Sequence, residues 1–241
     1  MRTLSQSSIL EARTQPMQLA DPLSKFDWSS LYDEYDALCE RFDSAAAFLD
    51  SFSPRPESDR MLYYALVDRF SDELRSPTGI SIESYEAMLY WKLYSQPAAV
   101  ANTCKPLRAN LRLREATGKS LLTLSARLPR TLIKDSTFLV DLTRSFNAYA
   151  IWGMKSLTAL PVRTTFLHVL QPAVVPIFDK QVLLAVGVTD RNANQSLRFL
   201  QTYIPHAWSL ANLYSEACSV FQKETDVRLV DMAMWVVRGG C

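Results

Sequence analysis

The chain has 241 residues, 48% of them hydrophobic, and a formal net charge of +1. This length is enough to bury the core of one large domain or of two small ones. Six glycines leave little room for glycine-rich β-turns or phosphate loops, and no Asn-Gly or Asp-Gly hairpin signal occurs. The composition therefore favours an all-α fold.

The four cysteines, Cys39, Cys104, Cys218 and Cys241, are widely spaced and include no Cys-x-x-Cys pair. Zinc and iron–sulfur sites of the common spacings are thereby excluded, and we expect no metal and no cofactor. A reduced intracellular protein is the natural interpretation. No apolar run is long enough for a signal peptide or a membrane span, so we expect a cytoplasmic protein that does not contact membranes.

In chain order, residues 1–25 read as an N-terminal arm that is at best partly ordered. A single all-helical domain over residues 26–241 is expected to follow. Its first helix begins at Asp27, carries apolar residues at helical spacing as far as Ala46, and is stopped by Ser53-Pro54. Ser81 is positioned to cap a later helix. The closing helices are expected from 195 to 222, broken near Pro205, and from 226 to 237.

Charge is distributed unevenly along the chain. Residues 27–59 hold nine acidic side chains and two basic ones, whereas residues 105–134 hold eight basic side chains and one acidic one. Such a basic segment is typical of a surface that faces a polyanion. The alternative is that the basic helices pair with the acidic N-terminal segment inside the fold.

The stretch 156–188 organises the chain. Its pattern predicts a helix that ends at a Leu160-Pro161 turn, a second helix from Arg163 to Leu170, and a bend at Pro172 and Pro176. Asp179 then opens a third helix, where the free N–H groups and the positive end of the helix dipole favour a carboxylate. Taken alone, an aspartate in that position is most often a helix cap.

Two motifs of this stretch resemble the helix-hairpin-helix DNA glycosylases. Residues 160–165, Leu-Pro-Val-Arg-Thr-Thr, are similar to the family's hairpin, and residues 176–182, Pro-Ile-Phe-Asp-Lys-Gln-Val, are similar to its Val-Asp-x-x-Val segment. Both hairpin glycines are missing, the spacing to the aspartate is shorter, and no lysine occupies the hairpin. The resemblance implies a two-lobed all-α fold with a degenerate hairpin.

The resemblance also implies a function for Asp179. It falls on the family's catalytic aspartate, which supports cleavage of the N-glycosidic bond of a nucleotide flipped out of DNA. Because the hairpin lysine is missing, we expect a monofunctional glycosylase with no lyase activity. Similar bacterial proteins act in phage defence on hypermodified bases such as glucosylated hydroxymethylcytosine, which makes such a base a possible substrate.

Further residues are candidates for contacts with DNA and with the flipped base. For DNA contacts the candidates are Arg163, Thr164, Lys180, Lys155, Arg108 and Arg112. For the base pocket they are Tyr149, Trp152, His168 and Trp91. For each there is a structural alternative: solvated surface for the cations, and core packing for the aromatic residues and His168.

Two other function classes remain open on the sequence. One is a DNA-binding protein that keeps the fold without catalysis and binds through residues 105–134, with Asp179 dispensable. The other is a helical scaffold whose partner is a protein. The retained aspartate after the Pro-rich bend favours a glycosylase, and the missing hairpin glycines favour the binding protein.

Overall fold

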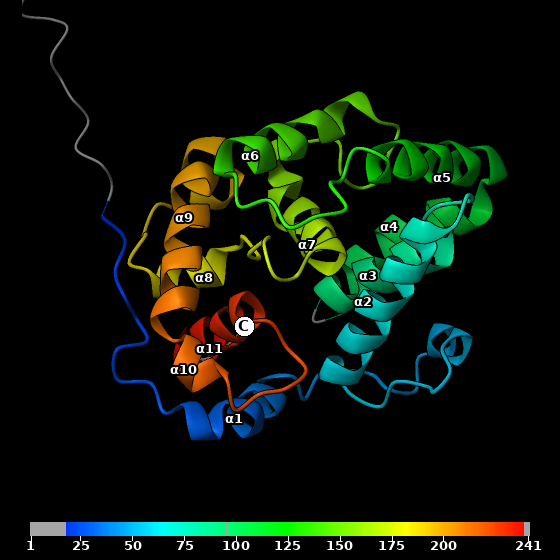
Figure 1. The fold of residues 1–241 in the computed structure, drawn as a ribbon. Coiled ribbons are helices and arrows are strands. Elements are labelled where there is room, and N and C mark those ends of the chain that lie inside the picture. The colour runs from blue at the N-terminus through cyan, green and yellow to red at the C-terminus, as the bar shows by residue number, and fades with distance from the viewer. Residues whose placement is uncertain (1–17, 95, 239–241) are drawn as a thin grey trace, which may run out of the picture.

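The computed structural model describes residues 18–94 and 96–238. Within these residues every regular element is helical and no strand occurs, which confirms the all-α prediction (Figure 1). The α-helices are α1 Leu31–Leu38, α2 Asp59–Arg75, α3 Ile82–Leu93, α4 Pro97–Ala109, α5 Leu111–Ser125, α6 Ser136–Ser145, α7 Leu160–Leu170, α8 Lys180–Ala185, α9 Leu197–Leu213, α10 Ser215–Cys218 and α11 Asp226–Arg238. Short 3₁₀ turns, η2 Trp28–Ser30, η3 Ala47–Ser51, η4 Phe146–Ala148, η5 Leu157–Ala159 and η6 Ala193–Gln195, lie between them.

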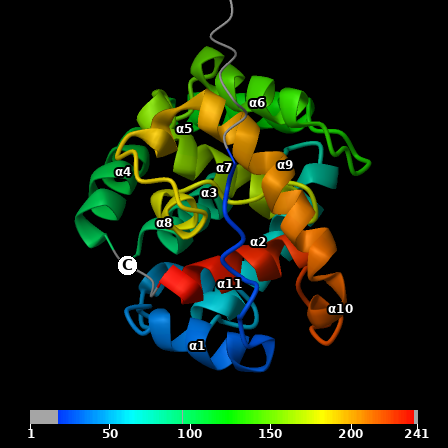
Figure 2. The same ribbon diagram turned by 90° about the vertical axis from the view of Figure 1, so that its left-hand side faces the viewer.

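The helices form two groups with α7 between them. Helices α2 to α5 pack in sequence on one side, and α8, α9 and α11 pack together on the other (Figures 1 and 2). Helix α7 contacts α2, α3 and α6, and its fully buried Phe166 meets the rings of Phe70, Tyr85 and Phe146 edge-on. Helix α1 packs on α11 and also contacts the start of α2, where Arg60 forms an ion pair with Asp36 at 2.6 Å.

Part of the predicted N-terminal arm is described. Its first 17 residues lie outside the described residues, and residues 18–25 run across the second group of helices (Figure 2). There the N–H of Ala20 donates to Val186 O at 3.0 Å, and Leu23 is buried in the core. These contacts join the start of the described chain to α8 and α9.

The first helix is also shorter than predicted. Helix α1 ends at Leu38, and the chain from Cys39 to Ala46 has no regular structure. Asp43 accepts a hydrogen bond from the N–H of Ala45, and Arg55 donates to the carbonyl of Ser44. Such local side-chain bonds compete with the helix ladder, which an apolar pattern alone does not reveal.

The predicted hairpin is not formed as two helices around Leu160-Pro161. Helix α7 starts at Leu160, and the described chain from 146 to 159 contains only 3₁₀ turns and loop. Proline is well tolerated in the first turn of a helix, so Pro161 lies inside the helix and does not end one. Upstream, Gly153 adopts φ +81°, a left-handed conformation that favours glycine and interrupts any helix there.

Helix α9 runs without a break through Pro205, contrary to the prediction. Pro205 and Gln201, whose carbonyl the proline leaves without its helical donor, are both exposed. Water can therefore satisfy that carbonyl, so the cost of the proline is reduced.

The helices do not include one suited to a bilayer. In the described part of the chain, no helix combines the length and apolar character needed to cross a membrane.

Candidate functional site

Asp179 is held rigidly at the start of α8. Its Oδ1 accepts hydrogen bonds from the N–H groups of Gln181 and Val182, at 2.9 and 3.1 Å, so the predicted cap is confirmed. Its Oδ2 lies 2.9 Å from Nζ of Lys92, near the end of α3. The carboxylate is only 7% exposed. Asp179 is therefore fixed in direction and paired with one cation.

The bend before Asp179 is fixed by buried side chains. Asp231 of α11 accepts from the N–H of Ile177 at 2.9 Å, and the hydroxyl of Thr164 accepts from the N–H of Phe178 at 3.1 Å. His168 Nδ1 lies 2.6 Å from Val175 O. Every residue from Val174 to Asp179 is buried. The backbone that leads into Asp179 thus has few conformations open to it.

Burial changes the acid–base behaviour of two of these groups. Desolvation lowers the pKa of His168 to about 3, and the positive charge of Arg228 acts in the same direction. The neutral imidazole then donates from Nδ1 to Val175 O and accepts at Nε2 from the hydroxyl of Tyr63, 3.0 Å away. Desolvation raises the pKa of Asp231 to about 7, even though the Ile177 N–H opposes that shift. His168 is a structural group and not a base.

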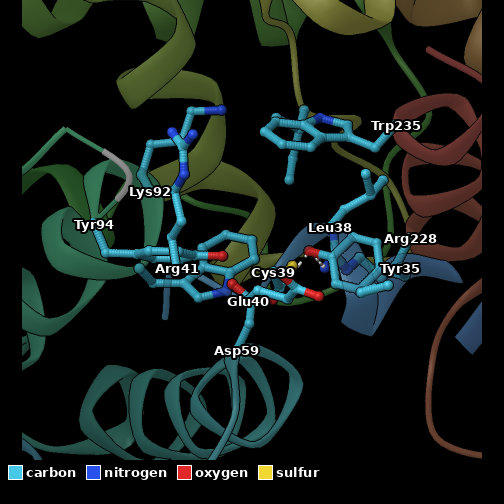
Figure 3. Close-up of a pocket in the computed structure, with 13 residues that line it drawn as sticks. Tyr35, Leu38, Cys39, Glu40, Arg41, Asp59, Lys92, Tyr94, Arg228 and Trp235 are labelled. Atoms are coloured by element: carbon cyan, nitrogen blue, oxygen red, sulfur yellow. Dashed lines mark hydrogen bonds between the residues drawn. The ribbon is translucent and has the colours of Figure 1, made fainter. Parts of the chain in front are cut away.

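A cavity of about 210 Å³ opens between α1, α3 and α11 (Figure 3). Lys92 is among the residues that line it, whereas its ion-pair partner Asp179 is not. A cavity of about 150 Å³ is enough to admit benzene, and a heterocyclic base therefore fits by volume. The other lining residues come from α1 and the turn after it, the start of α2, the end of α3, the bend and α11: Tyr35, Ala37, Leu38, Cys39, Glu40, Arg41, Asp59, Trp91, Tyr94, Ile177, Arg228 and Trp235.

The polar groups of the cavity form a connected chain. Nη2 of Arg228 donates to the hydroxyl of Tyr35 at 2.7 Å, and that hydroxyl donates to Oδ1 of Asp59 at 3.0 Å. Desolvation raises the pKa of Asp59, while the Arg228 charge acts against it. Within the described residues Nε of Arg228 and Nε1 of Trp91 have no hydrogen-bond partner. The cavity therefore combines buried donors with an acceptor of raised basicity.

Aromatic rings surround this polar chain. The guanidinium carbon of Arg228 lies 5.1, 4.6 and 5.2 Å from the ring centres of Tyr35, Tyr63 and Trp91. Nζ of Lys92 lies 5.9 Å from the ring centre of Trp235 on the opposite helix. Cation–π contacts of this kind keep both cations in place while leaving ring faces beside the cavity. A flat, partly polar ligand suits such walls.

Two predicted DNA contacts are wrong. Arg163 is fully buried, and its guanidinium donates to Met154 O, Thr143 O and Asn147 Oδ1 at 2.8, 3.1 and 2.6 Å. Thr164 is 1% exposed, and its hydroxyl donates to the carbonyls of the preceding turn. Because α7 begins at Leu160, both residues point into the core, and neither can reach a phosphate.

The other predicted DNA contacts lie on the surface. Lys180, Lys155 and Arg112 are exposed, and Arg108 is exposed while its Nε contacts Glu86 at 3.2 Å. Lys180 adjoins Asp179, whereas Arg108 and Arg112 lie on α4 and α5. Among the described residues, the segment 105–134 forms no ion pair with residues 27–59. The basic segment is therefore not neutralised by the acidic one.

Only one of the predicted base-pocket residues lines the cavity. Trp91 does so, but Tyr149 and Trp152 lie in the loop before α7, where the Tyr149 hydroxyl accepts from Arg127 and the Trp152 carbonyl accepts from Tyr85. His168 is buried behind the bend. Tyr149, Trp152 and His168 do not line this cavity, and the loop that contains the first two packs against α3 and α5.

Most residues that line the cavity were not predicted from the sequence. Lys92 is 87 positions from Asp179, and Tyr35 is 193 positions from Arg228, so no local spacing links them. One signal was available: Arg228, Asp231 and Trp235 share a face of the last helix at i, i+3 and i+7. From this spacing, Arg228 and Asp231 are expected to pair with each other. In the structure Arg228 instead donates to the hydroxyl of Tyr35, and Asp231 accepts from the N–H of Ile177.

Comparisons of this chain with models of known protein families, with curated proteins and with solved structures gave no significant match. The function of this protein is therefore inferred from its own sequence and structure.

Proposed function

We propose that this protein is a monofunctional DNA glycosylase of helix-hairpin-helix type, in which Asp179 supports hydrolysis of the N-glycosidic bond of a flipped nucleotide. The observation that carries the proposal is the environment of Asp179, a capped and nearly buried carboxylate whose ion-pair partner, Lys92, lines a ring-sized cavity. The motif resemblance of residues 160–182 supports the family, and the all-helical architecture is compatible with it. The structure departs from the family pattern at the hairpin.

Asp179 has the properties that this chemistry needs. As the glycosidic bond breaks, positive charge develops on the sugar, and a fixed carboxylate stabilises it and orients or deprotonates the attacking water. Two backbone N–H groups hold Oδ1, so the carboxylate keeps its direction without needing to reorganise. Lys92 is a positioning residue in this scheme, because it contacts Oδ2.

The cavity provides the binding site for the flipped base. A base taken out of the duplex loses its stacking partners and its paired hydrogen bonds, and the pocket must replace both. Trp91, Tyr94 and Trp235 offer ring faces, while Arg228 and Asp59 offer a donor and an acceptor at the polar end. The base therefore lies among these rings, and its sugar points toward the Lys92–Asp179 pair.

The substrate proposed from the motif resemblance, a modified base in DNA, can be tested directly. Purified protein is incubated with plain, uracil-containing, alkylated and oxidised DNA, and with phage DNA that carries glucosylated hydroxymethylcytosine. An aldehyde-reactive probe then detects abasic sites. We expect sites on one class of DNA, and none on that DNA with Asp179→Asn, because asparagine preserves the cap but removes the negative charge. Base release at an undiminished rate by that variant would refute the proposed mechanism.

The exposed basic segment favours a second candidate, a DNA-binding protein without catalysis. Residues 105–134 are free of pairing with the acidic segment within the described chain. This candidate predicts salt-dependent DNA binding that Asp179→Asn leaves intact, and no abasic sites on any DNA. Absence of DNA binding at low salt would leave the helical scaffold.

A further inference from the structure

A second concave site adjoins the cavity. It has a volume of about 260 Å³ and lies between the start of α8, the loop after α8 and the end of α11. Figure 2 shows α8 directly over the C-terminal part of α11. Three cations from separate parts of the chain line it, Lys180, Arg191 and Arg238, together with Leu183, Leu184, Val188, Thr189, Asp190 and Asn194.

The charge of this second site is strongly one-sided. Lys180, Arg191 and Arg238 are all exposed, and within the described residues none of them forms an ion pair. The single carboxylate is that of Asp190, and its Oδ1 is already engaged by the N–H of Asn192 at 2.9 Å. Thr189 and Asn194 add uncharged donors. Three cations and a single carboxylate in one hollow, counted over the described residues, leave an excess of positive charge that favours an anionic ligand.

Two connections through the chain relate this hollow to the base cavity. Lys180 directly follows Asp179 in the chain. On α11, Trp235 lines the cavity and Arg238 lines the hollow. These residues are three positions apart, so their backbones are separated along the helix by about 4.5 Å. Successive phosphates of one DNA strand lie about 3.4 Å apart along the helix axis, a distance comparable with this separation. A strand whose nucleotide enters the cavity can therefore present a phosphate to the hollow.

We propose that Lys180, Arg191 and Arg238 form a phosphate-binding site for the DNA strand that carries the flipped nucleotide. The inference rests on the proposed function for the identity of the ligand as a DNA phosphodiester, whereas the charges of the site indicate an anion. Arginine binds phosphate oxygens through its planar pair of N–H groups, and Lys180 adds a point charge. Thr189 and Asn194 complete the contacts without adding sequence preference.

The experiment compares DNA binding across salt concentrations. The affinity for a labelled, unmodified DNA duplex is measured for the wild-type protein, Arg191→Gln, Arg238→Gln and the double variant. Each lost phosphate contact reduces the slope of log K against log salt by about 0.9. We expect this reduction in each single variant and about twice that in the double variant. Because both arginines are exposed, the folded state is retained, and thermal unfolding verifies this.

Arg75→Gln is the matched control. Arg75 is an exposed arginine at the end of α2 that lines a different concavity, and it contacts Asp72 at 3.2 Å. Its loss removes the same charge, and we expect an unchanged salt slope. Slopes for Arg191→Gln and Arg238→Gln equal to those of wild type and Arg75→Gln would overturn the inference.

The outcome for the phosphate site is separable from the outcome for the glycosylase. If the wild-type protein releases no base from any DNA, and the slopes still fall as expected, the phosphate site stands and the catalytic assignment fails. If base is released and the slopes are unchanged, only the phosphate site fails. If the wild-type protein binds no DNA at low salt, both fail.

Discussion

Lys92 and Asp179, from helices that are distant in the chain, form an ion pair of 2.9 Å at the edge of the cavity. Their side chains are only 13% and 9% exposed. A pair at that depth is screened little by salt, and removing one partner leaves an uncompensated charge in a poorly solvated place. The pair therefore fixes where the carboxylate points and joins α3 to the bend before α8.

Lys92→Met tests that pair. We expect a loss of about 2 to 3 kcal/mol in the free energy of unfolding, because the Asp179 carboxylate loses its only cationic partner in the described chain. Base release is expected to fall about tenfold or more, since a poorly placed carboxylate stabilises charge less well. Chemical denaturation and single-turnover kinetics measure the two effects. Lys92→Arg keeps the charge, and we expect it to recover most of the stability.

The same pair predicts the absence of lyase chemistry. A lysine held as an ammonium group by a carboxylate at 2.9 Å is a poor nucleophile. Borohydride added during the reaction should therefore trap no covalent protein–DNA adduct. A trapped adduct that disappears in Lys92→Arg would show that Lys92 acts as an amine nucleophile, against this account.

Trp235 supplies a ring face to the cavity from α11. Truncation to alanine removes one stacking surface, and base–aromatic stacking contributes about 1 to 3 kcal/mol per base. We expect Trp235→Ala to raise KM about tenfold or more with a smaller effect on kcat. Trp235→Phe keeps a ring and serves as the control. Equal KM values for the alanine, phenylalanine and wild-type proteins would exclude Trp235 from base binding.

Asp231 gives the fold a characteristic pH dependence. Burial raises its pKa in the folded state to about 7, from 3.8. At this carboxyl the folded protein binds more protons than the unfolded chain between these values, so the Asp231 contribution to stability falls as pH increases, while the lowered pKa of His168 acts in the opposite direction between about 3 and 6.5. The contribution of Asp231 to the free energy of unfolding is fully present below about pH 4 and is lost as pH rises through about 7. It amounts to at most about 4 kcal/mol.

Asp231→Asn removes this titration. An amide oxygen can still accept from the N–H of Ile177, while its NH₂ faces the Tyr203 hydroxyl. Because the lowered pKa of His168 contributes stability that rises with pH between about 3 and 6.5, we expect the unfolding temperature of Asp231→Asn to rise more steeply over this range than that of the wild type, in which Asp231 opposes the rise. Parallel curves for the two proteins would show that another group causes the dependence.

Arg163 is a core residue, and its loss should act on stability and not on DNA binding. Arg163→Met leaves two buried carbonyls and one amide oxygen without their donors. We expect a loss of about 3 kcal/mol or more in the free energy of unfolding. The salt slope of DNA binding by the remaining folded protein should be unchanged. The exposed Arg112→Met should do the reverse, lowering the slope with little effect on stability.

Features of the fold that depend on neighbouring residues could be predicted from the sequence. The caps at Ser81 and Asp179 are correct because a cap depends on side chains within three residues, and both accept the expected N–H groups. The bend at Pro172 and Pro176 is also local. Arg163 misled the prediction because an arginine after a Leu-Pro turn resembles a surface residue. Its buried carbonyl partners, as far as 20 positions away, are set by tertiary packing.

The candidate site was less predictable for the same physical reason. Asp179 is recognisable because its motif is contiguous. The Lys92 pair, the Tyr35–Arg228 bond and the Asp59 carboxyl depend on α1 packing against α11 and on α3 ending near the bend. No spacing in one sequence specifies those contacts.

The most direct measurement is the single-turnover rate of base release by wild type, Asp179→Asn and Asp135→Asn on the DNA class that yields abasic sites. Asp135 is the matched control, since it caps α6 by accepting from the N–H groups of Thr137 and Phe138, far from the cavity. Asparagine caps helices as well as aspartate does; because Asp179→Asn also leaves Lys92 without its carboxylate, thermal unfolding is measured for both variants and the rates are compared at a temperature where both are folded. We predict that Asp179→Asn lowers the rate at least about 100-fold, within the range for catalytic acid–base groups, while Asp135→Asn matches wild type. Equal rates for the two variants would contradict a catalytic role for Asp179.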